Sequence, residues 1–113
     1  MANSFVNKKV DLTTTSATTL YTVPDATTAI IKSIIVSEDS GNADTITVTI
    51  TDAAAAVFSV FKTKAVSANA TIELLTASLV LQQNEVLKVT AATANRLHVI
   101  LSALQSKPRD VIT

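Results

Sequence analysis

The segment from Thr45 to Thr51 alternates strictly between threonine and branched aliphatic residues. A period of two places the hydroxyl groups on one face of a β-strand and the aliphatic groups on the other, whereas a helix would mix the two sets. We therefore predict a strand here, with one face in a core. The alternating residues are Thr45, Ile46, Thr47, Val48, Thr49, Ile50 and Thr51.

The rest of the chain has the same character, because Thr, Val and Ile make up about a third of its 113 residues and their branched β-carbons favour strands. Turn-forming residues separate the apolar segments at intervals of roughly ten residues, a spacing typical of antiparallel sandwiches. We predict one domain over residues 1–113, an all-β antiparallel sandwich, jelly-roll-like, with about eight strands. The expected strands are Phe5–Leu12, Thr18–Val23, Ala29–Glu38, Thr45–Thr51, Val57–Val66, Thr71–Leu75, Glu85–Ala91 and Leu97–Leu104, with a shorter one at Leu79–Gln82.

The turns have to form almost without glycine, since the chain contains a single one, Gly41. Asparagine tolerates the left-handed backbone conformation better than most residues. We therefore expect the left-handed turn positions at Asn42, Asn69, Asn84 and Asn95.

The segment Ala29–Val36 is apolar on both of its predicted faces. Strict alternation places Ile31 and Ile35 on one face, and the other face carries Ile30, Ile34 and Val36. A strand that is apolar on both faces is covered on both sides. One face of this strand is therefore expected to meet a second sheet and the other a partner.

Charge and composition exclude several classes of function. Nine basic and nine acidic residues give a formal net charge of zero, without the basic patch of a nucleic-acid or membrane binder. The chain has no cysteine for a thiol nucleophile or a cysteine-ligated zinc site, and one glycine cannot make a phosphate-binding loop. It also lacks an apolar run of membrane-spanning length and the apolar core of a signal peptide. We expect a chain that is neither secreted nor bound to membranes or nucleic acid.

Two polar features are candidates for chemistry. His98, the one histidine, lies in a predicted strand without a nucleophile motif nearby and is interpreted as a surface or interface residue. The loop from Glu38 to Asp44 is rich in oxygen ligands, and a calcium site there is the alternative to a solvated acidic turn. We expect no enzymatic activity, no catalytic residue and no cofactor.

The two ends differ from the regular centre and are predicted to form extended arms at residues 1–11 and 106–113. Pro108 interrupts the last strand before an apolar pair. Apolar residues outside the most regular strands stabilise an assembly when they are buried against a neighbouring subunit. The candidate subunit-interface residues are Phe5, Val6, Val111 and Ile112, and a trimer or other small ring of identical copies is expected.

Four phrases of the sequence resemble small structural proteins of tailed-phage virions, especially those of marine cyanophages. These phrases are Thr19–Pro24, Thr28–Val36, the alternating strand Asp44–Asp52 and Asn84–Ala91. Relatives tend to carry glycine where this chain has Asp25-Ala26 and Gln83-Asn84. The resemblance implies a virion structural protein, assembled in the host cytoplasm, most simply a decoration or cement protein that stabilises the head by contact with the major capsid protein.

Two alternatives remain open at this point. The same module could belong to the tail, baseplate or fibre and contact tail proteins. It could also be a carbohydrate- or receptor-binding module, although the four aromatic residues make a sparse sugar-binding surface.

Overall fold

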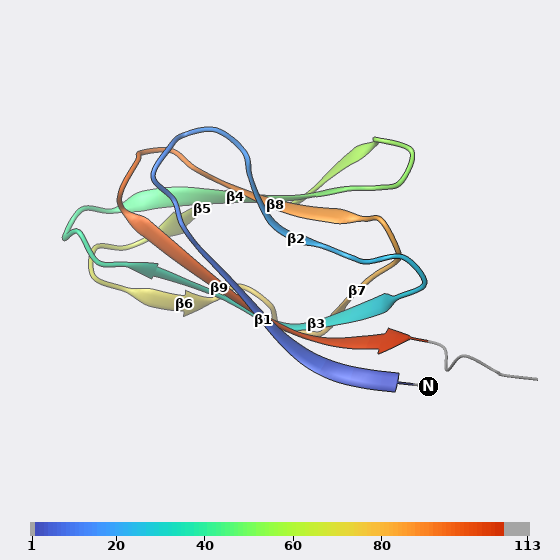
Figure 1. Ribbon diagram of the computed structural model, residues 1–113. Helices are drawn as coiled ribbons and strands as arrows, with labels where there is room; N and C mark the ends of the chain where they lie inside the picture. Colours follow the sequence, from blue (N-terminus) through green and yellow to red (C-terminus); the bar gives the residue numbers. More distant parts are fainter. Residues whose placement is uncertain (1, 108–113) are drawn as a thin grey trace, which may run out of the picture.

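The computed structural model describes residues 2–107, which form nine antiparallel strands in two facing sheets (Figure 1). The five-stranded sheet contains β1 (Ala2–Asp11), β9 (Leu97–Lys107), β3 (Thr28–Glu38), β6 (Thr71–Glu73) and β7 (Leu79–Leu81). The four-stranded sheet contains β2 (Thr18–Thr22), β8 (Val86–Ala91), β4 (Asp44–Thr51) and β5 (Val57–Val66). The predicted all-β antiparallel sandwich is confirmed.

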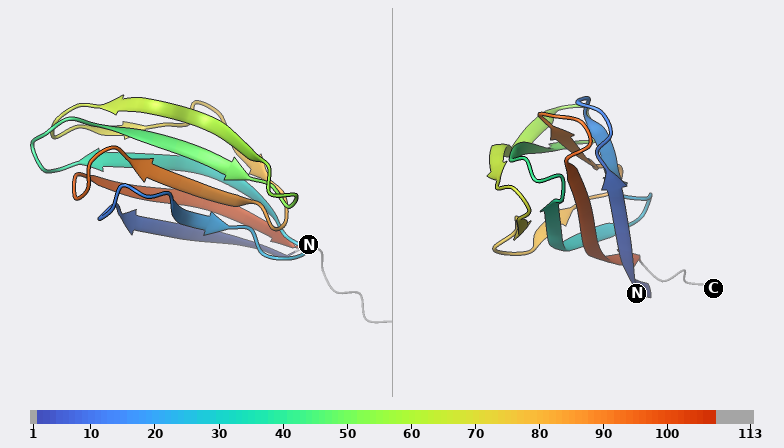
Figure 2. Two further views of the ribbon diagram at one scale, coloured as in Figure 1. Left: turned by 90° about the horizontal axis from the view of Figure 1, so that it is seen from above. Right: turned by 90° about the vertical axis from the view of Figure 1, so that its left-hand side faces the viewer.

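The strand order is that of a jelly roll. One sheet runs β1-β9-β3-β6 and the other β2-β8-β4-β5, so that the chain passes from sheet to sheet instead of completing one sheet first. The short strands β6 and β7 pair with different halves of β3, and together they act as one interrupted edge strand. Counted in this way the sandwich has eight strand positions, as the sequence predicts. Figure 2 shows the two sheets from above and from one end.

The core lies between the sheets and is almost entirely aliphatic. Alternate residues of β4, β8 and β9 point inward; in β9 these are Leu97, Val99, Leu101 and Ala103, which are buried. One aromatic ring, Tyr21 of β2, joins them and is 2% exposed. Its hydroxyl accepts a hydrogen bond of 2.6 Å from Gln105 Nε2 of β9, which links the two sheets.

A bulge in β3 corrects the predicted faces of Ala29–Val36. The pairing of β3 with β9 shifts register between Ile31 and Ser33, so one extra residue interrupts the alternation. Ile31 and Ile34 are consequently both buried, although strict alternation places them on opposite faces. Ile30 and Ile35 lie on the outer face instead.

Glu73 stabilises the break between β6 and β7. Its carboxylate accepts hydrogen bonds from the backbone N–H of Ile34 at 2.8 Å and of Leu75 at 3.2 Å, and from the Ser33 hydroxyl. Burial raises the pKa of Glu73, but these hydrogen bonds outweigh it and hold the pKa below the ordinary 4.5. The side chain thus satisfies backbone donors that the interrupted edge leaves unpaired.

Most left-handed backbone conformations occur in turns, and one, at Thr63, lies within β5. The predictions for Asn69, Asn84 and Asn95 are confirmed, with φ angles of 59°, 65° and 65°. Asn42 does not adopt this conformation; its neighbour Gly41 does, at φ 83°. Glycine takes the position because it has no Cβ to clash there.

The N-terminal residues form part of the sandwich. Residues 2–11, expected as an extended arm, pair with β9 over their whole length as the edge strand β1. This pairing satisfies the backbone groups that point toward β9, whereas those on the other side of β1 have no neighbouring strand in the sheet. Of the expected arm at 106–113, Ser106 and Lys107 belong to β9, and the remaining residues lie outside the described part. In residues 2–107 there is no helix with the length and apolar character needed to span a membrane.

Candidate functional site

The outer face of the five-stranded sheet carries an apolar row that crosses four strands. Phe5 of β1 pairs in register with Leu104 of β9, which pairs with Ile30 of β3, which pairs with Val80 of β7. Register partners on one face of a sheet have neighbouring side chains. Four apolar side chains from distant parts of the chain therefore lie side by side on the surface, and we call them the apolar row.

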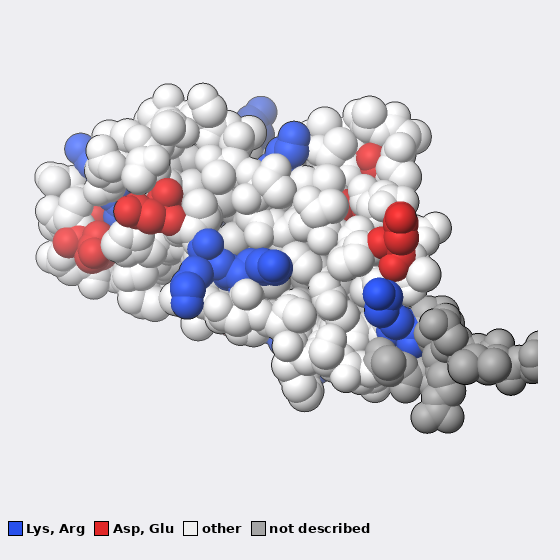
Figure 3. All heavy atoms as spheres, viewed as in Figure 1, with Lys and Arg blue, Asp and Glu red and all other residues white. Residues whose placement is uncertain are grey.

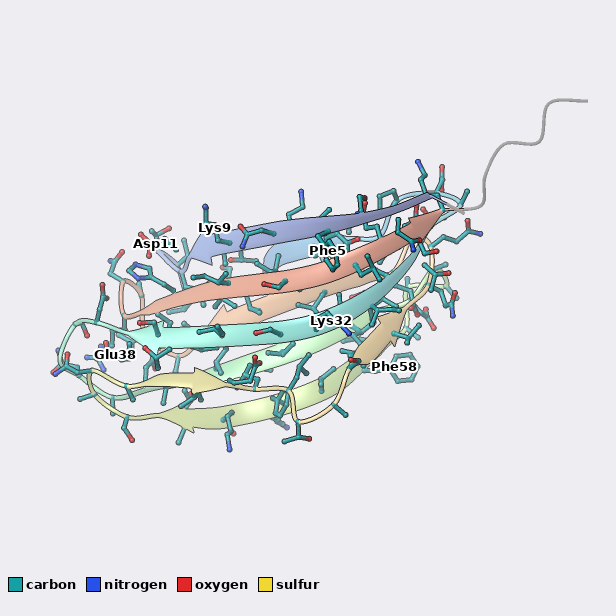
Figure 4. All side chains as sticks on the ribbon, turned by 90° about the horizontal axis from the view of Figure 1, so that it is seen from below. Phe5, Lys9, Asp11, Lys32, Glu38 and Phe58 are labelled. Atoms are coloured by element: carbon teal, nitrogen blue, oxygen red, sulfur yellow. The ribbon has the colours of Figure 1, made fainter. Side chains whose placement is uncertain are left out.

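The two ends of the apolar row are the more exposed members. Phe5 is 82% exposed and Val80 52% exposed, while Leu104 and Ile30 are partly buried between them. An aromatic ring this exposed is unusual on a small folded domain. Figure 4 views the face and shows Phe5 and Lys9 on β1 and Lys32 on β3. The residues Phe5, Asn7, Lys32 and Ser102 line a shallow hollow beside the row.

A second row lies further along the same strands and combines apolar and charged side chains. Lys9 of β1 pairs with Ile100 of β9, Ile100 with Ile35 of β3, and Ile35 with Glu73 of β6. Two apolar residues thus separate a lysine at one edge from a carboxylate at the other. Across three strand spacings the two charges are about 14 Å apart, too far for an ion pair within one chain. We call this set the mixed row.

The predicted interface residues differ in where they lie. Phe5 is on the outer face, as an interface residue requires, but Val6 points the other way and packs against the core of its own chain. The reason is the alternation of side chains along a strand. Val111 and Ile112 lie outside the described residues. The other members of the apolar row were not singled out from the sequence, although the two apolar faces of Ala29–Val36 indicated that one face of β3 meets a partner.

His98 lies between two carboxylates at the far end of this face. Its Nε2 is 3.3 Å from Asp11 Oδ1, and its Nδ1 is 3.5 Å from Asp39 Oδ2. Ser37 is its register partner on β3. A serine nucleophile needs one imidazole nitrogen as its base, but both nitrogens of His98 face carboxylates. The arrangement is an exposed charge cluster and lacks the geometry of a catalytic triad.

The acidic loop from Glu38 to Asp44 directs its carboxylates toward N–H groups. Glu38 accepts hydrogen bonds from the backbone N–H groups of Ser40, Gly41, Asn42 and Asn69. Asp44 accepts them from Thr45 and Thr93. Donors thus occupy the oxygen atoms that a calcium ion would need, and residues 2–107 contain no group of three or more His, Asp or Glu side chains that could hold a metal.

Exposed apolar residues also occur at the β5 edge of the other sheet. Val57 is 63% exposed and Phe58 56% exposed, at the start of this strand. The pairing of β4 with β5 shifts register twice, around Val48, and Thr63 has a φ angle of 48°. Bulges of this kind disrupt the regular ladder that a further strand would need. The outer face of the five-stranded sheet is therefore the better candidate for a broad contact.

Charged side chains occupy a small part of the face that Figure 3 shows. Figure 3 shows lysines and acidic residues in small separated groups with uncharged surface between them. In the described part of the chain, no lysine forms an ion pair; the close contacts between a basic side chain and a carboxylate are those of His98 with Asp11 and Asp39. A broad contact with this surface would therefore involve mainly apolar and hydroxyl groups.

Comparison with known proteins shows a shared fold. No protein-family model and no curated protein sequence matches the chain. A solved structure of Bacillus endospore appendages, described as a family of disulfide-linked pili, is similar with a TM-score of 0.54 and 13% sequence identity. The alignment covers 96% of this chain and 93% of that one. At this identity the similarity shows a shared fold over nearly the whole of both chains.

Proposed function

We propose that the chain is a structural subunit, which builds a larger assembly through contacts with copies of itself and with neighbouring proteins and which catalyses no reaction. The observation that carries this proposal is the apolar row, with Phe5 82% exposed at its end. An exposed apolar surface costs free energy in water, and it commonly marks a protein contact. The similarity to a pilus protein also supports a structural subunit, because the similar chain is a building block of pili.

Within this class we propose a decoration or cement protein on the capsid of a tailed phage, located in the virion after assembly in the host cytoplasm. The support is the sequence resemblance in Thr19–Pro24, Thr28–Val36, Asp44–Asp52 and Asn84–Ala91. A thin sandwich with one apolar face suits a protein that lies on a larger surface and holds neighbouring capsid subunits together. Small contacts repeated over many symmetric copies give strong attachment in total.

The second candidate is a tail, baseplate or fibre component, and the pilus similarity favours it, since pili are filaments. The linkage described for those pili cannot operate here, because this chain contains no cysteine. Any filament of this protein would be held together without disulfides. A third candidate, the carbohydrate- or receptor-binding module, has less support, because Phe5 and Phe58 are the exposed aromatic residues of the described part.

Labelling of particles distinguishes these candidates. Antibodies against the purified chain, applied to purified virions and viewed by electron microscopy, are expected to label heads at many copies per particle. Label on tails or fibres would favour the second candidate. Particles without the protein would overturn the virion proposal, and glycan-array binding by the purified chain would favour the third candidate. Light scattering of the same preparation reports whether copies associate and whether they form the expected trimer or ring.

A further inference from the structure

We propose that two copies of the chain pack through the outer faces of their five-stranded sheets, about a two-fold axis that runs parallel to the strands between β9 and β3. This inference rests on the proposed structural function and specifies its first contact. The sheet order β1-β9-β3-β6 places β9 and β3 in the middle. The two-fold operation therefore brings β9 of one copy over β3 of the other, and β1 over the β6 and β7 edge.

Under this operation each row of one copy faces the same row of the other in reverse order. In the apolar row, Phe5 then faces Val80 and Leu104 faces Ile30. The four side chains form a self-complementary set, as a two-fold interface requires. Phe5 and Val80, the two exposed members, are the ones that cover each other.

The mixed row gives the independent argument, which is charge complementarity. In the same arrangement Lys9 of one copy faces Glu73 of the other, twice by symmetry, and Ile100 faces Ile35. The Glu73 carboxylate accepts hydrogen bonds within its own chain, but these lower its pKa, so it keeps the negative charge that attracts the lysine. Lys9 forms no ion pair within the described part of its own chain. Lys32 faces the region of Ser102, and Asp11 faces Thr71, so these rows oppose no like charges.

The other way of placing a two-fold axis in the plane of the interface fits less well. An axis across the strands at the middle of the sheet, through the row of Asn7 and Ser102, would place the apolar row against the mixed row, with Phe5 over Lys9 and Val80 over Glu73. Burying charged groups against apolar ones is costly. Centring that axis on the apolar row would place Phe5 against Phe5 but would leave the far half of the sheet uncovered. Of these three axes, the parallel one matches both rows over the whole face.

The area is sufficient for a specific pair. Four strand positions about 4.8 Å apart and about ten residues long present roughly 600 to 700 Å² per copy. Specific interfaces bury about 800 Å² per partner, so a pair of this size is near the standard range. An assembly built on this contact contains an even number of copies, a dimer or a multiple of dimers, in place of the trimer expected from the sequence.

Cysteine cross-linking tests the arrangement, since the natural chain contains no cysteine. Phe5→Cys and Val80→Cys chains are made separately and also co-expressed with different tags, then oxidised and resolved on non-reducing gels. We expect a covalent heterodimer from the co-expressed pair and little product from either variant alone. Co-expression of Phe5→Cys with Thr71→Cys is the matched control and is expected to give little product, because position 71 faces Asp11, about 20 Å along the strands.

A second measurement does not depend on the thiols. Phe5→Ser combined with Val80→Ser changes two exposed side chains, so the fold should persist, with an unchanged circular dichroism spectrum. We expect the dimer dissociation constant to rise by about tenfold or more, since each change counts twice in the pair. Association as strong as that of the natural chain would overturn the proposal.

The remaining outcomes separate this inference from the proposed function. Self-linkage of Phe5→Cys alone, or association of the natural chain without heterodimer formation, would overturn the two-fold arrangement while leaving a self-associating subunit. A natural chain that is monomeric at all concentrations but present in purified particles would overturn the pairing alone. A monomeric chain absent from particles would overturn both.

Discussion

Glu38 at the end of β3 accepts a hydrogen bond of 3.1 Å from the backbone N–H of Asn69, although the two residues are 31 positions apart in the chain. The same carboxylate accepts hydrogen bonds from Ser40, Gly41 and Asn42. One side chain thus connects the β3–β4 loop to the β5–β6 loop at the end of the sandwich where β3 stops. Its 1% exposure is consistent with a structural role.

The pH dependence of stability follows from this carboxylate. Burial raises the pKa of Glu38, but the hydrogen bonds from the Ser40 hydroxyl and from the N–H groups of Asn69, Ser40 and Gly41 outweigh it and lower the pKa from 4.5 to about 2. The folded state therefore binds the proton less readily than the unfolded chain does. The stabilisation is complete above about pH 4.5 and is lost as the pH falls toward 2. Glu73, whose pKa is also lowered, acts in the same direction.

Glu38→Gln tests this prediction through the melting temperature measured at several pH values. We expect the variant to melt lower than the natural chain at pH 7 and to lose less stability between pH 4.5 and 2. Asp25→Asn is the control, because Asp25 is exposed and its carboxylate has no hydrogen bond in the described part of the chain. A melting profile of Glu38→Gln that parallels the natural one across this pH range would contradict the assignment.

Tyr21→Phe should weaken the link between the two sheets. The change removes the hydroxyl that accepts the 2.6 Å hydrogen bond from Gln105 and leaves the buried ring in place. A hydrogen bond of this kind contributes about 1 kcal/mol to the free energy of unfolding. Urea denaturation of Tyr21→Phe, Gln105→Ala and the double variant gives the coupling energy. Additive effects of the two single changes would show that the bond contributes nothing.

Ala55→Gly should stabilise the protein. Ala55 has a φ angle of 67° in the turn between β4 and β5, a conformation in which its Cβ is crowded and glycine is not. The free energy recovered by relieving this strain exceeds the cost of glycine's greater conformational freedom in the unfolded chain. We expect the free energy of unfolding to rise by about 0.5 kcal/mol. Ala54→Gly is the matched control in the same turn, without a positive φ angle, and should be destabilising. If the two changes shifted the melting temperature equally, the backbone at Ala55 would not be strained.

Leu101→Ala and Ile100→Ala compare the two faces of β9. Leu101 is 0% exposed in the core, and its truncation should cost about 3 kcal/mol through lost burial and a residual cavity. Ile100, its neighbour, is 37% exposed on the outer face, and its truncation should cost less than about 1 kcal/mol in the separate chain. Denaturation at low protein concentration measures both. If Ile100→Ala lost more stability than Leu101→Ala under these conditions, the face of β9 that carries Ile100 would be the one in the core, contrary to the structure.

The local sequence predicts most of the strands and several of the turns. The alternation in Thr45–Thr51 identifies β4 to within one residue, because a period of two is a property of neighbouring residues alone. Asn69, Asn84 and Asn95 adopt the left-handed conformation for an equally local reason, their low steric cost at positive φ. The jelly-roll prediction follows from strand number and spacing, and the sheet order agrees with it.

The candidate surface required the tertiary structure. Phe5 and Leu104 are neighbours only because β1 pairs with β9, and Ile30 joins them through a register that depends on contacts across most of the chain. The bulge at Lys32 and Ser33 also brings Ile31 and Ile34 onto the same face, although local alternation assigns them to opposite faces. Alternation determines which residues share a face within one strand, whereas cross-strand register and bulges depend on how the whole sandwich packs. The sequence alone therefore determined the strands and their apolar character, and only the tertiary structure decided which apolar residues meet on the surface.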